Sequence, residues 1–143
     1  MKNIEEAVRV NLVKEALRKK AQAYVPYSHF HVGAAVLTET AQIIGGFNIE
    51  NASYGATNCG ERTAIFSALN QGAKKIRAIA IVGDAAEYTY PCGICRQVMI
   101  EFMDPDGEVI IARDPGDYKI YQLKDLLPGA FTKADLSVSQ DKE

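Results

Sequence analysis

The sequence predicts an α/β fold in which helices cover a mixed β-sheet. Segments rich in β-branched residues alternate along the chain with segments whose apolar residues recur at helical spacing. The order begins with a helix and two strands in succession, which favours a mixed sheet over a purely parallel one. A later segment, Ile76–Gly83, is almost entirely apolar, as expected of a strand covered on both faces. With 143 residues, 48% of them hydrophobic, the chain has the size of one domain, 1–143.

The first part of the chain predicts a helix followed by a hairpin. Apolar residues from Ile4 to Leu17 fall on one side of a helix whose first turn is acidic and whose last turn is basic, which suits the helix dipole. Pro26 ends this segment, because proline disfavours helix at the residue before it. The stretches Phe30–Thr38 and Gln42–Ile49 follow as strands with a short connection, which predicts an antiparallel pair.

The middle of the chain predicts two helices on either side of the buried strand. Residues 51–57 are small and polar and are expected to form a loop, and a helix follows over Asn58–Asn70. After the strand Ile76–Gly83, the sequence Pro91-Cys92-Gly93 opens a second helix, which ends before Pro105. The strand between these helices therefore makes a crossover connection.

The last part of the chain is expected to be less regular. Asp104–Gly107 has the composition of a turn, and Glu108–Ala112 is a further strand. Leu123–Leu127 predicts a short helix that is closed by proline and glycine. Residues 135–143 are expected to fray.

Charge and hydropathy exclude several classes of partner. Sixteen basic and 18 acidic residues give a net charge of −2, which argues against nucleic acid as a partner. The longest apolar runs are too short to cross a bilayer, and the N-terminal stretch lacks the uninterrupted apolar core of a signal peptide. We therefore expect a cytoplasmic protein with no membrane partner.

The three cysteines predict a metal site. Cys59, Cys92 and Cys95 are few and odd in number, which is a poor basis for a disulfide framework. Cys92 and Cys95 lie at the start of one predicted helix and Cys59 at the start of the other, where the helix dipole favours thiolates. The crossover sets both helix N-termini at one end of the sheet. We expect the three thiols to bind one zinc ion.

The residues next to Cys59 predict catalysis rather than a structural role. Three protein ligands leave the fourth tetrahedral position of zinc open, which is typical of a catalytic site. Glu61 lies two residues after Cys59 and is suited to moving protons there. Three thiolates carry more negative charge than Zn²⁺ offsets, so Arg62 is expected to donate hydrogen bonds to the sulfurs. The pattern matches the zinc-deaminase signature x-E…P-C-x-x-C.

Two other interpretations of these residues stay open. His29 and His31 would lie on one face of the first strand, and with Cys92 and Cys95 they could form a closed structural zinc site. That arrangement would leave Cys59 without a role. A Cys-x-x-Cys pair also occurs in redox proteins, although there it usually follows a first strand rather than a third.

Five segments of the sequence together resemble cytidine deaminase in its small, all-cysteine form. These segments are Tyr27–Ala35 (YSHFHVGAA), Phe47–Tyr54 (FNIENASY), Cys59–Ala64 (CGERTA), Pro91–Gln97 (PCGICRQ) and Leu126–Phe131 (LLPGAF). They span most of the chain in the order of the family. The resemblance implies a three-layer α/β/α sandwich with a mixed sheet of about five strands, and one zinc ion per subunit held by the three cysteines.

The resemblance also implies roles for residues around the metal. Glu61 would be the proton shuttle, and main-chain groups of Gly60 and Glu61 would bind the pyrimidine edge. Asn48 and Glu50 match a pair that binds ribose, a task for which an amide and a carboxylate are chemically suited. Phe30 matches an aromatic residue that packs on the pyrimidine.

The remaining matches lie at the edge of the implied site. Asn51 is expected to bind substrate. Tyr54 and Phe131 match residues that a neighbouring subunit supplies, which implies a homotetramer. Arg62 and Gln97 are expected to lie next to the zinc-binding cysteines and to orient them without binding the metal.

The implied activity is hydrolytic deamination of free cytidine and deoxycytidine with release of ammonia, a reaction of pyrimidine salvage. A blasticidin-type nucleoside deaminase shares the metal motifs, and a non-catalytic zinc module would hold zinc without turnover. Polynucleotide editing would need a basic groove, which the charge balance does not promise. The chain departs from the family at Gly60 and Ile94, where alanine is usual, and glycine in a helical turn costs up to about 1 kcal/mol.

Overall fold

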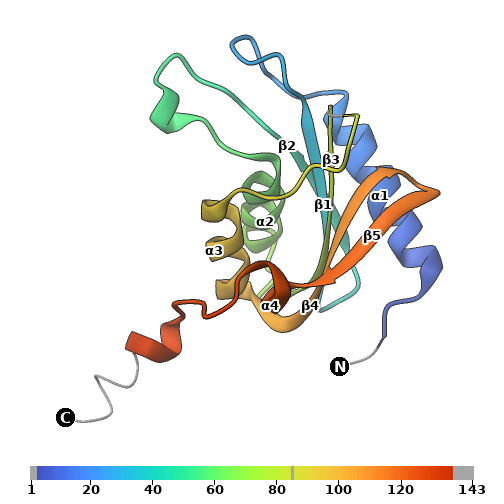
Figure 1. Ribbon diagram of the computed structural model, residues 1–143, viewed down its shortest axis with the longest axis vertical. Coiled ribbons are helices and arrows are strands. Elements are labelled where there is room, and N and C mark those ends of the chain that lie inside the picture. Colours follow the sequence, from blue (N-terminus) through green and yellow to red (C-terminus); the bar gives the residue numbers. More distant parts are fainter. Residues whose placement is uncertain (1–2, 85, 137–143) are drawn as a thin grey trace.

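The computed structural model describes residues 3–84 and 86–136, which form a five-stranded mixed sheet with helices on both faces (Figure 1). The strand order is β2-β1-β3-β4-β5. β3 and β4 are parallel, and the other neighbouring strands are antiparallel. The strands are β1 (Val32–Thr38), β2 (Ile43–Phe47), β3 (Ile76–Gly83), β4 (Met103–Asp114) and β5 (Asp117–Gln122).

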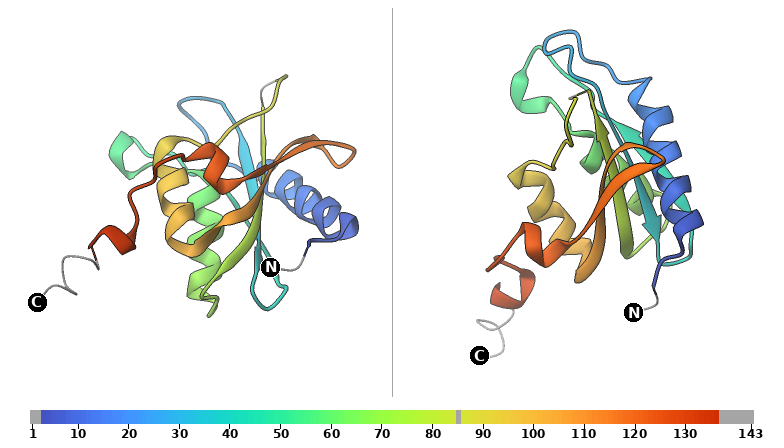
Figure 2. Two further views of the ribbon diagram at one scale, coloured as in Figure 1. Left: turned by 60° about the horizontal axis from the view of Figure 1, so that its bottom comes forward. Right: turned by 45° about the vertical axis from the view of Figure 1, so that its right-hand side comes forward.

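The helices divide between the two faces of the sheet. The views in Figure 2 place α1 on one face and α2 with α3 on the other, so the predicted three-layer α/β/α arrangement is confirmed. A short α4 follows β5 on the side of α3. The helices are α1 (Glu6–Lys20), the 3₁₀ turn η1 (Tyr54–Ala56), α2 (Gly60–Asn70), α3 (Gly93–Phe102) and α4 (Leu123–Leu126).

The apolar residues of the strands supply a separate core to each face. On β1, Ala34 and Val36 pack toward α2 and α3, while Ala35 and Leu37 pack toward α1. This alternation follows from the two-residue period of a strand. Because both faces are covered, the near-continuous apolar runs that the sequence shows in β1 and β3 are explained.

Two glycines let the helices approach the sheet closely. A Cβ atom on Gly33 would lie 1.9 Å from the Ala16 carbonyl oxygen of α1, and one on Gly46 would lie 2.4 Å from the Ala64 nitrogen of α2. Neither contact is sterically possible, so glycine is required at both positions. The height of α2 above the sheet, and with it the position of its N-terminus, depends on this approach.

The structure corrects several predicted boundaries. β1 begins at Val32 rather than Phe30, because the preceding turn includes His29 with φ 60°. β2 is shorter than predicted, and Ile49 makes only isolated bridges to Tyr24 and Asn58.

The predicted turn at Asp104–Gly107 instead lies within β4. The pairing of β4 with β3 nevertheless jumps from Met103 to Glu108, so the residues between them bulge out of the ladder. β5 was not predicted as a separate strand, because this edge strand mixes polar and apolar residues and is largely accessible to solvent.

The C-terminal prediction is only partly covered by the structure. Of the residues expected to fray, 137–143 lie outside the described residues. Asp135 and Leu136 belong to a helical turn, in which the Asp135 carboxylate accepts a hydrogen bond from the Thr132 backbone N–H at 2.8 Å. None of the helices in the described part of the chain has the length and apolar character needed to span a bilayer.

Candidate metal centre and substrate pocket

The three cysteines meet where α2 and α3 begin. Cys59 and Cys92 are the N-cap residues of α2 and α3, and Cys95 lies in the first turn of α3. Their sulfur atoms all lie within 4.8 Å of one another, and the Sγ atoms of Cys59 and Cys92 are 3.9 Å apart. The β3 crossover thus brings together thiols that are 33 residues apart in sequence.

The spacing of the thiols fits a zinc ion. A zinc–sulfur bond of about 2.3 Å and a tetrahedral angle place two coordinating sulfurs about 3.8 Å apart, close to the 3.9 Å between Cys59 and Cys92. Cys95 is buried, Cys59 is half-buried and Cys92 is exposed. The cluster is therefore closed on its inner side and accessible on the other.

The histidines take no part in this cluster. Within residues 3–84 and 86–136, the group of side chains placed to hold a metal consists of the three cysteines. The His31 Nδ1 atom lies 2.6 Å from Asp84 Oδ2, and His29 lies in the turn before β1. The alternative site made of two histidines and two cysteines is therefore wrong.

Arg62 contacts the cluster from α2. Its Nη2 atom donates a hydrogen bond to Cys59 Sγ at 3.2 Å. The pKa of Cys59 falls to about 5, first because of its hydrogen bond with Cys95 and further because of Arg62. The same bond to Cys59 raises the pKa of Cys95. Burial alone would lower the pKa of Arg62, but its hydrogen bonds to the two sulfurs outweigh burial and raise it. A thiolate at Cys59 is thus stabilised beside a fixed cation.

Glu61 is buried next to the thiols. It lies in the first turn of α2, is 4% exposed, and has a pKa raised to about 7, chiefly by burial. It opens onto a pocket of about 200 Å³. The pocket is lined by Phe30, Val32, Asn48, Cys59, Gly60, Glu61, Thr89, Tyr90 and Cys92.

Asn48 holds one wall of this pocket in place. Its Oδ1 atom accepts a hydrogen bond from the Val32 backbone N–H, and its Nδ2 atom donates to the Phe30 carbonyl oxygen, both at 2.9 Å. At the start of β1, the Asn48 side-chain amide therefore binds backbone groups that a neighbouring strand would otherwise bind. Phe30 and Val32 face the pocket because alternate residues of an extended chain point to the same side.

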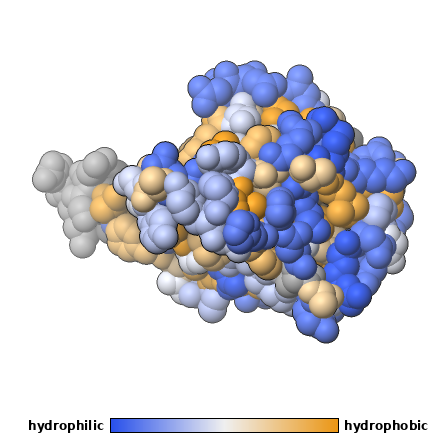
Figure 3. All heavy atoms as spheres, turned by 90° about the horizontal axis from the view of Figure 1, so that it is seen from above, coloured by the Kyte–Doolittle hydropathy of each residue, from blue (hydrophilic) through white to orange (hydrophobic). Residues whose placement is uncertain are grey.

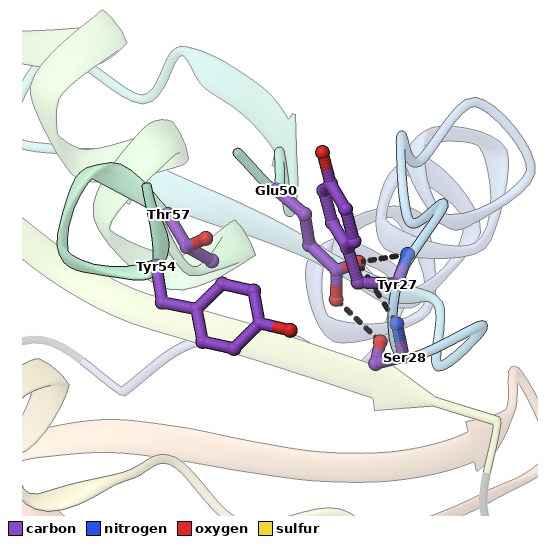
Figure 4. Close-up of a pocket in the computed structure, with 5 residues that line it drawn as sticks. All are labelled: Tyr27, Ser28, Glu50, Tyr54 and Thr57. Atoms are coloured by element: carbon purple, nitrogen blue, oxygen red, sulfur yellow. Dashed lines mark hydrogen bonds between the residues drawn. The ribbon is translucent and has the colours of Figure 1, made fainter. Parts of the chain in front are cut away.

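Glu50 and Tyr54 lie in a second, neighbouring pocket of about 350 Å³ (Figure 4). The Glu50 carboxylate accepts hydrogen bonds from the backbone N–H groups of Tyr27 and Ser28 at 3.0 and 3.1 Å and from the Ser28 hydroxyl. The Ser28 hydroxyl is the main cause of the lowered pKa of Glu50. The rings of Tyr27 and Tyr54 meet edge to face, with centroids 5.9 Å apart.

Apart from Cys95 and Arg62, which belong to the metal cluster, three candidate residues line neither pocket. Asn51 accepts a hydrogen bond from the Ser53 backbone N–H at 2.8 Å and so shapes its own loop. Phe131 is 59% exposed, and its carbonyl oxygen accepts a hydrogen bond from Gln97 Nε2 at 2.7 Å. Gln97 therefore ties α3 to the C-terminal segment and makes no hydrogen bond with a cysteine among the contacts described.

The two departures from the family pattern have different surroundings. A Cβ atom on Gly60 would lie 3.1 Å from the Val32 carbonyl oxygen, so an alanine there would be tight against the start of β1. Ile94 is exposed on α3 and does not line the pocket with Glu61.

Sequence reasoning missed Val32, Thr89 and Tyr90, which line the pocket with Glu61. Tyr90 could have been predicted to lie near the site, because it directly precedes the Pro91–Cys95 motif. The signal for Val32 was its alternation with Phe30.

Comparison with known proteins agrees with this geometry. The family model for the cytidine and deoxycytidylate deaminase zinc-binding region matches residues 7–112 of this chain. A cytidine deaminase of Halalkalibacterium halodurans is 49% identical over 90% of this chain and 98% of the relative, and one of Sporosarcina psychrophila is 45% identical over 92% and 96%. The crystal structure of cytidine deaminase from Burkholderia pseudomallei superposes with a TM-score of 0.80 at 47% identity, covering 85% of this chain and 97% of that one. The chain belongs to the zinc-binding cytidine and deoxycytidylate deaminase family.

Proposed function

We propose that this chain catalyses the zinc-dependent hydrolysis of free cytidine and deoxycytidine to uridine and deoxyuridine, with release of ammonia, as a step of pyrimidine salvage. The observation that carries the proposal is the shared pocket, onto which the buried Glu61 carboxyl group opens together with the thiols of Cys59 and Cys92. The third thiol, Cys95, closes the cluster from the inner side.

Glu61 performs the proton transfers in this proposal. Zinc held by the three cysteines supplies a Lewis acid that makes water nucleophilic near neutral pH. The Glu61 carboxylate takes a proton from the attacking water and gives it to the ring nitrogen beside the reacting carbon. It then takes the second proton of that water and delivers it to the leaving amino group. Water and cytidine thus become uridine and ammonia, and Glu61 returns to its starting state.

The N-terminus of α2 is suited to hold the pyrimidine. The backbone N–H groups of Gly60 and Glu61 belong to the first turn of the helix, where no carbonyl oxygen within the helix is available to them. The Glu61 N–H contacts the carboxyl group of its own side chain, and we infer that both N–H groups turn to a carbonyl oxygen of the base when it binds. The Phe30 ring lines the same pocket and offers an apolar surface to the pyrimidine.

Asn48 and Glu50 have only part of their hydrogen-bonding capacity left for a sugar. The Asn48 amide makes two bonds within the protein, which leaves one N–H and one lone pair. The Glu50 carboxylate accepts three, which leaves one further acceptor site. We infer that each binds one ribose hydroxyl and that Asn51 holds the loop beside them.

The proposal includes a homotetramer with shared sites and a cytoplasmic location. Tyr54 and Phe131 are 75% and 59% exposed, which supports a role at a contact with another subunit. Mixing Glu61→Gln with Phe131→Ala should restore activity if one subunit completes the site of another, and sedimentation should give the mass of a tetramer. Three free thiols support a reducing compartment, which fractionation of cells would test.

The decisive experiment measures ammonia release from cytidine, with zinc content determined on the same sample. We expect Glu61→Gln to retain zinc and to lose about 10²-fold or more in kcat. Glu101→Gln, which alters an exposed carboxylate on α3, is the matched control and should keep wild-type activity. A zinc-loaded wild type without turnover would indicate a non-catalytic zinc module, and a fully active Glu61→Gln would refute the mechanism. A higher kcat/KM for blasticidin S than for cytidine would reassign the substrate.

A further inference from the structure

Asp84 joins three elements at the edge of the pocket. It directly follows β3, whose last residue, Gly83, pairs with Val32 at the start of β1. Its Oδ2 atom accepts hydrogen bonds from the His31 backbone N–H and lies equally close to His31 Nδ1, both at 2.6 Å. Its Oδ1 atom pairs with Lys20 Nζ of α1 at 3.2 Å.

The segment that Asp84 holds needs such a partner. His29 has φ 60°, so the chain turns immediately before β1 and residues 30 and 31 lie outside the sheet. The backbone groups of these residues therefore have no strand partner, and side chains bind several of them. The Asn48 amide donates a hydrogen bond to the Phe30 carbonyl oxygen and accepts one from the Val32 N–H. The Asp84 carboxylate accepts a hydrogen bond from the His31 N–H between them. The Ser28 hydroxyl oxygen accepts a further hydrogen bond from the Phe30 N–H at 3.0 Å, so three side chains hold the backbone of three consecutive residues.

This held segment is a wall of the pocket. Phe30 and Val32 line the pocket with Glu61, whereas the ring of His31 lies with Asp84 and Lys20 on the other side. The connection that begins at Asp84 also supplies Thr89 and Tyr90 to the same pocket. Asp84 itself is not one of the residues that line it. One carboxylate therefore links two walls of the pocket without touching its contents.

We propose that Asp84 is a positioning residue for substrate binding, which fixes Phe30 and Val32 against the base through the backbone N–H of His31. The inference rests on the proposed function, because it assigns a consequence for the binding of cytidine. The contact to the backbone carries the effect. The contacts to the His31 ring and to Lys20 contribute to stability and leave substrate binding unchanged.

Steady-state kinetics with cytidine on zinc-loaded variants test the inference. Asp84→Ala should raise KM about tenfold, the factor that corresponds to the loss of one hydrogen bond to a charged group. The kcat should stay within about twofold of wild type, because the variant weakens binding of the substrate and of the transition state equally. Asp84→Asn keeps an oxygen acceptor for the His31 N–H and should recover most of the loss.

Three further variants separate positioning from stability. His31→Ala and Lys20→Met each remove one side-chain partner of Asp84 but leave the backbone contact, so KM should stay within about twofold of wild type even where Tm falls. Asp106→Asn removes an exposed carboxylate at the other end of the sheet and should change neither value.

An unchanged KM in Asp84→Ala, or an equal rise in Lys20→Met, would overturn the inference. Should Asp84→Ala not fold with zinc, Asp84→Ser is measured in its place, and failure of both to fold would assign Asp84 to folding alone. Wild-type protein that binds zinc but releases no ammonia would refute the proposed function instead, so the two failures are distinguishable.

Discussion

Replacing Arg62 by glutamine should weaken zinc binding by about 10- to 100-fold, the usual effect of losing a partner that orients metal ligands. The Nη2 atom of Arg62 donates to Cys59 Sγ at 3.2 Å, and hydrogen bonds to both Cys59 and Cys95 raise the pKa of the guanidinium. A hydrogen bond that involves a charged group contributes about 1.5–3 kcal/mol. Within the described part of the chain, the buried Nε atom of Arg62 has no hydrogen-bond partner. The guanidinium therefore interacts with the sulfurs through its terminal nitrogens.

The assay is competition for zinc against a chromophoric chelator, on wild type, Arg62→Gln and Arg62→Lys. The lysine variant keeps the positive charge but loses the fork of donors, so its zinc affinity should fall between the other two. Unfolding in urea, measured with saturating zinc, controls for a general loss of stability. Zinc affinity of Arg62→Gln within twofold of wild type would refute the reasoning, and so would an Arg62→Lys variant that is weaker than the uncharged one.

Three further predictions concern stability. Gly33→Ala would place a Cβ atom 1.9 Å from the Ala16 carbonyl oxygen and should lower the free energy of unfolding by about 3 kcal/mol; in urea titrations Gly55→Ala, which has nothing within 4 Å, should stay within about 0.5 kcal/mol of wild type. Hydrogen bonds from His31 and Lys20 outweigh burial and lower the pKa of Asp84 from 3.8 to about 2, so its stabilisation is present above about pH 4 and is lost as the pH falls toward 2. The side chain is 32% exposed, and screening therefore reduces the contribution to about 1 kcal/mol; the difference between wild type and Asp84→Asn, followed by urea unfolding across this range, should shrink, and a difference that grows on acidification would contradict the assignment. Removal of zinc by a chelator should lower Tm by about 5 °C or more, with recovery when zinc is returned, because the ion links the starts of α2 and α3; an unchanged Tm would show that the cysteines hold no stabilising metal.

The elements that bury a continuous apolar pattern could be predicted from the sequence. β3 was found with its observed bounds because every residue from Ile76 to Val82 except Arg77 is apolar, and a strand covered on both faces leaves that pattern. The meeting of the cysteines followed from topology, since a crossover places the starts of two successive helices at one end of the sheet.

Interactions between side chains and irregular backbone could not be predicted in the same way. Asn48, Glu50 and Asp84 each hold the segment before β1 by bonds to its backbone, and such bonds depend on how a turn folds rather than on residue periodicity. The family resemblance implied ribose binding for Asn48 and Glu50 but gave no sign of this second task. β5 was missed for a related reason, because an edge strand with one neighbour needs little apolar character.

The position of the pocket depends on the register of β1 as well as on the side chains that hold the segment before it. Sliding β1 by one residue would turn Phe30 and Val32 away from Glu61 and bring His31 into the pocket, because side chains alternate along a strand. Two features oppose that slip. It would exchange Ala35 and Leu37, which face α1, with Ala34 and Val36, which face α2 and differ from them in summed side-chain size. It would also move Gly33 from a place where the backbone of α1 approaches too closely for a Cβ atom. Seen from the end that carries the loops around residues 27 and 54 (Figure 3), hydrophobic residues form patches separated by hydrophilic ones. The packing of α1 on the far face of the sheet therefore decides which side chains meet the substrate on the near face, and a variant that loosens α1 should raise KM before it affects zinc binding.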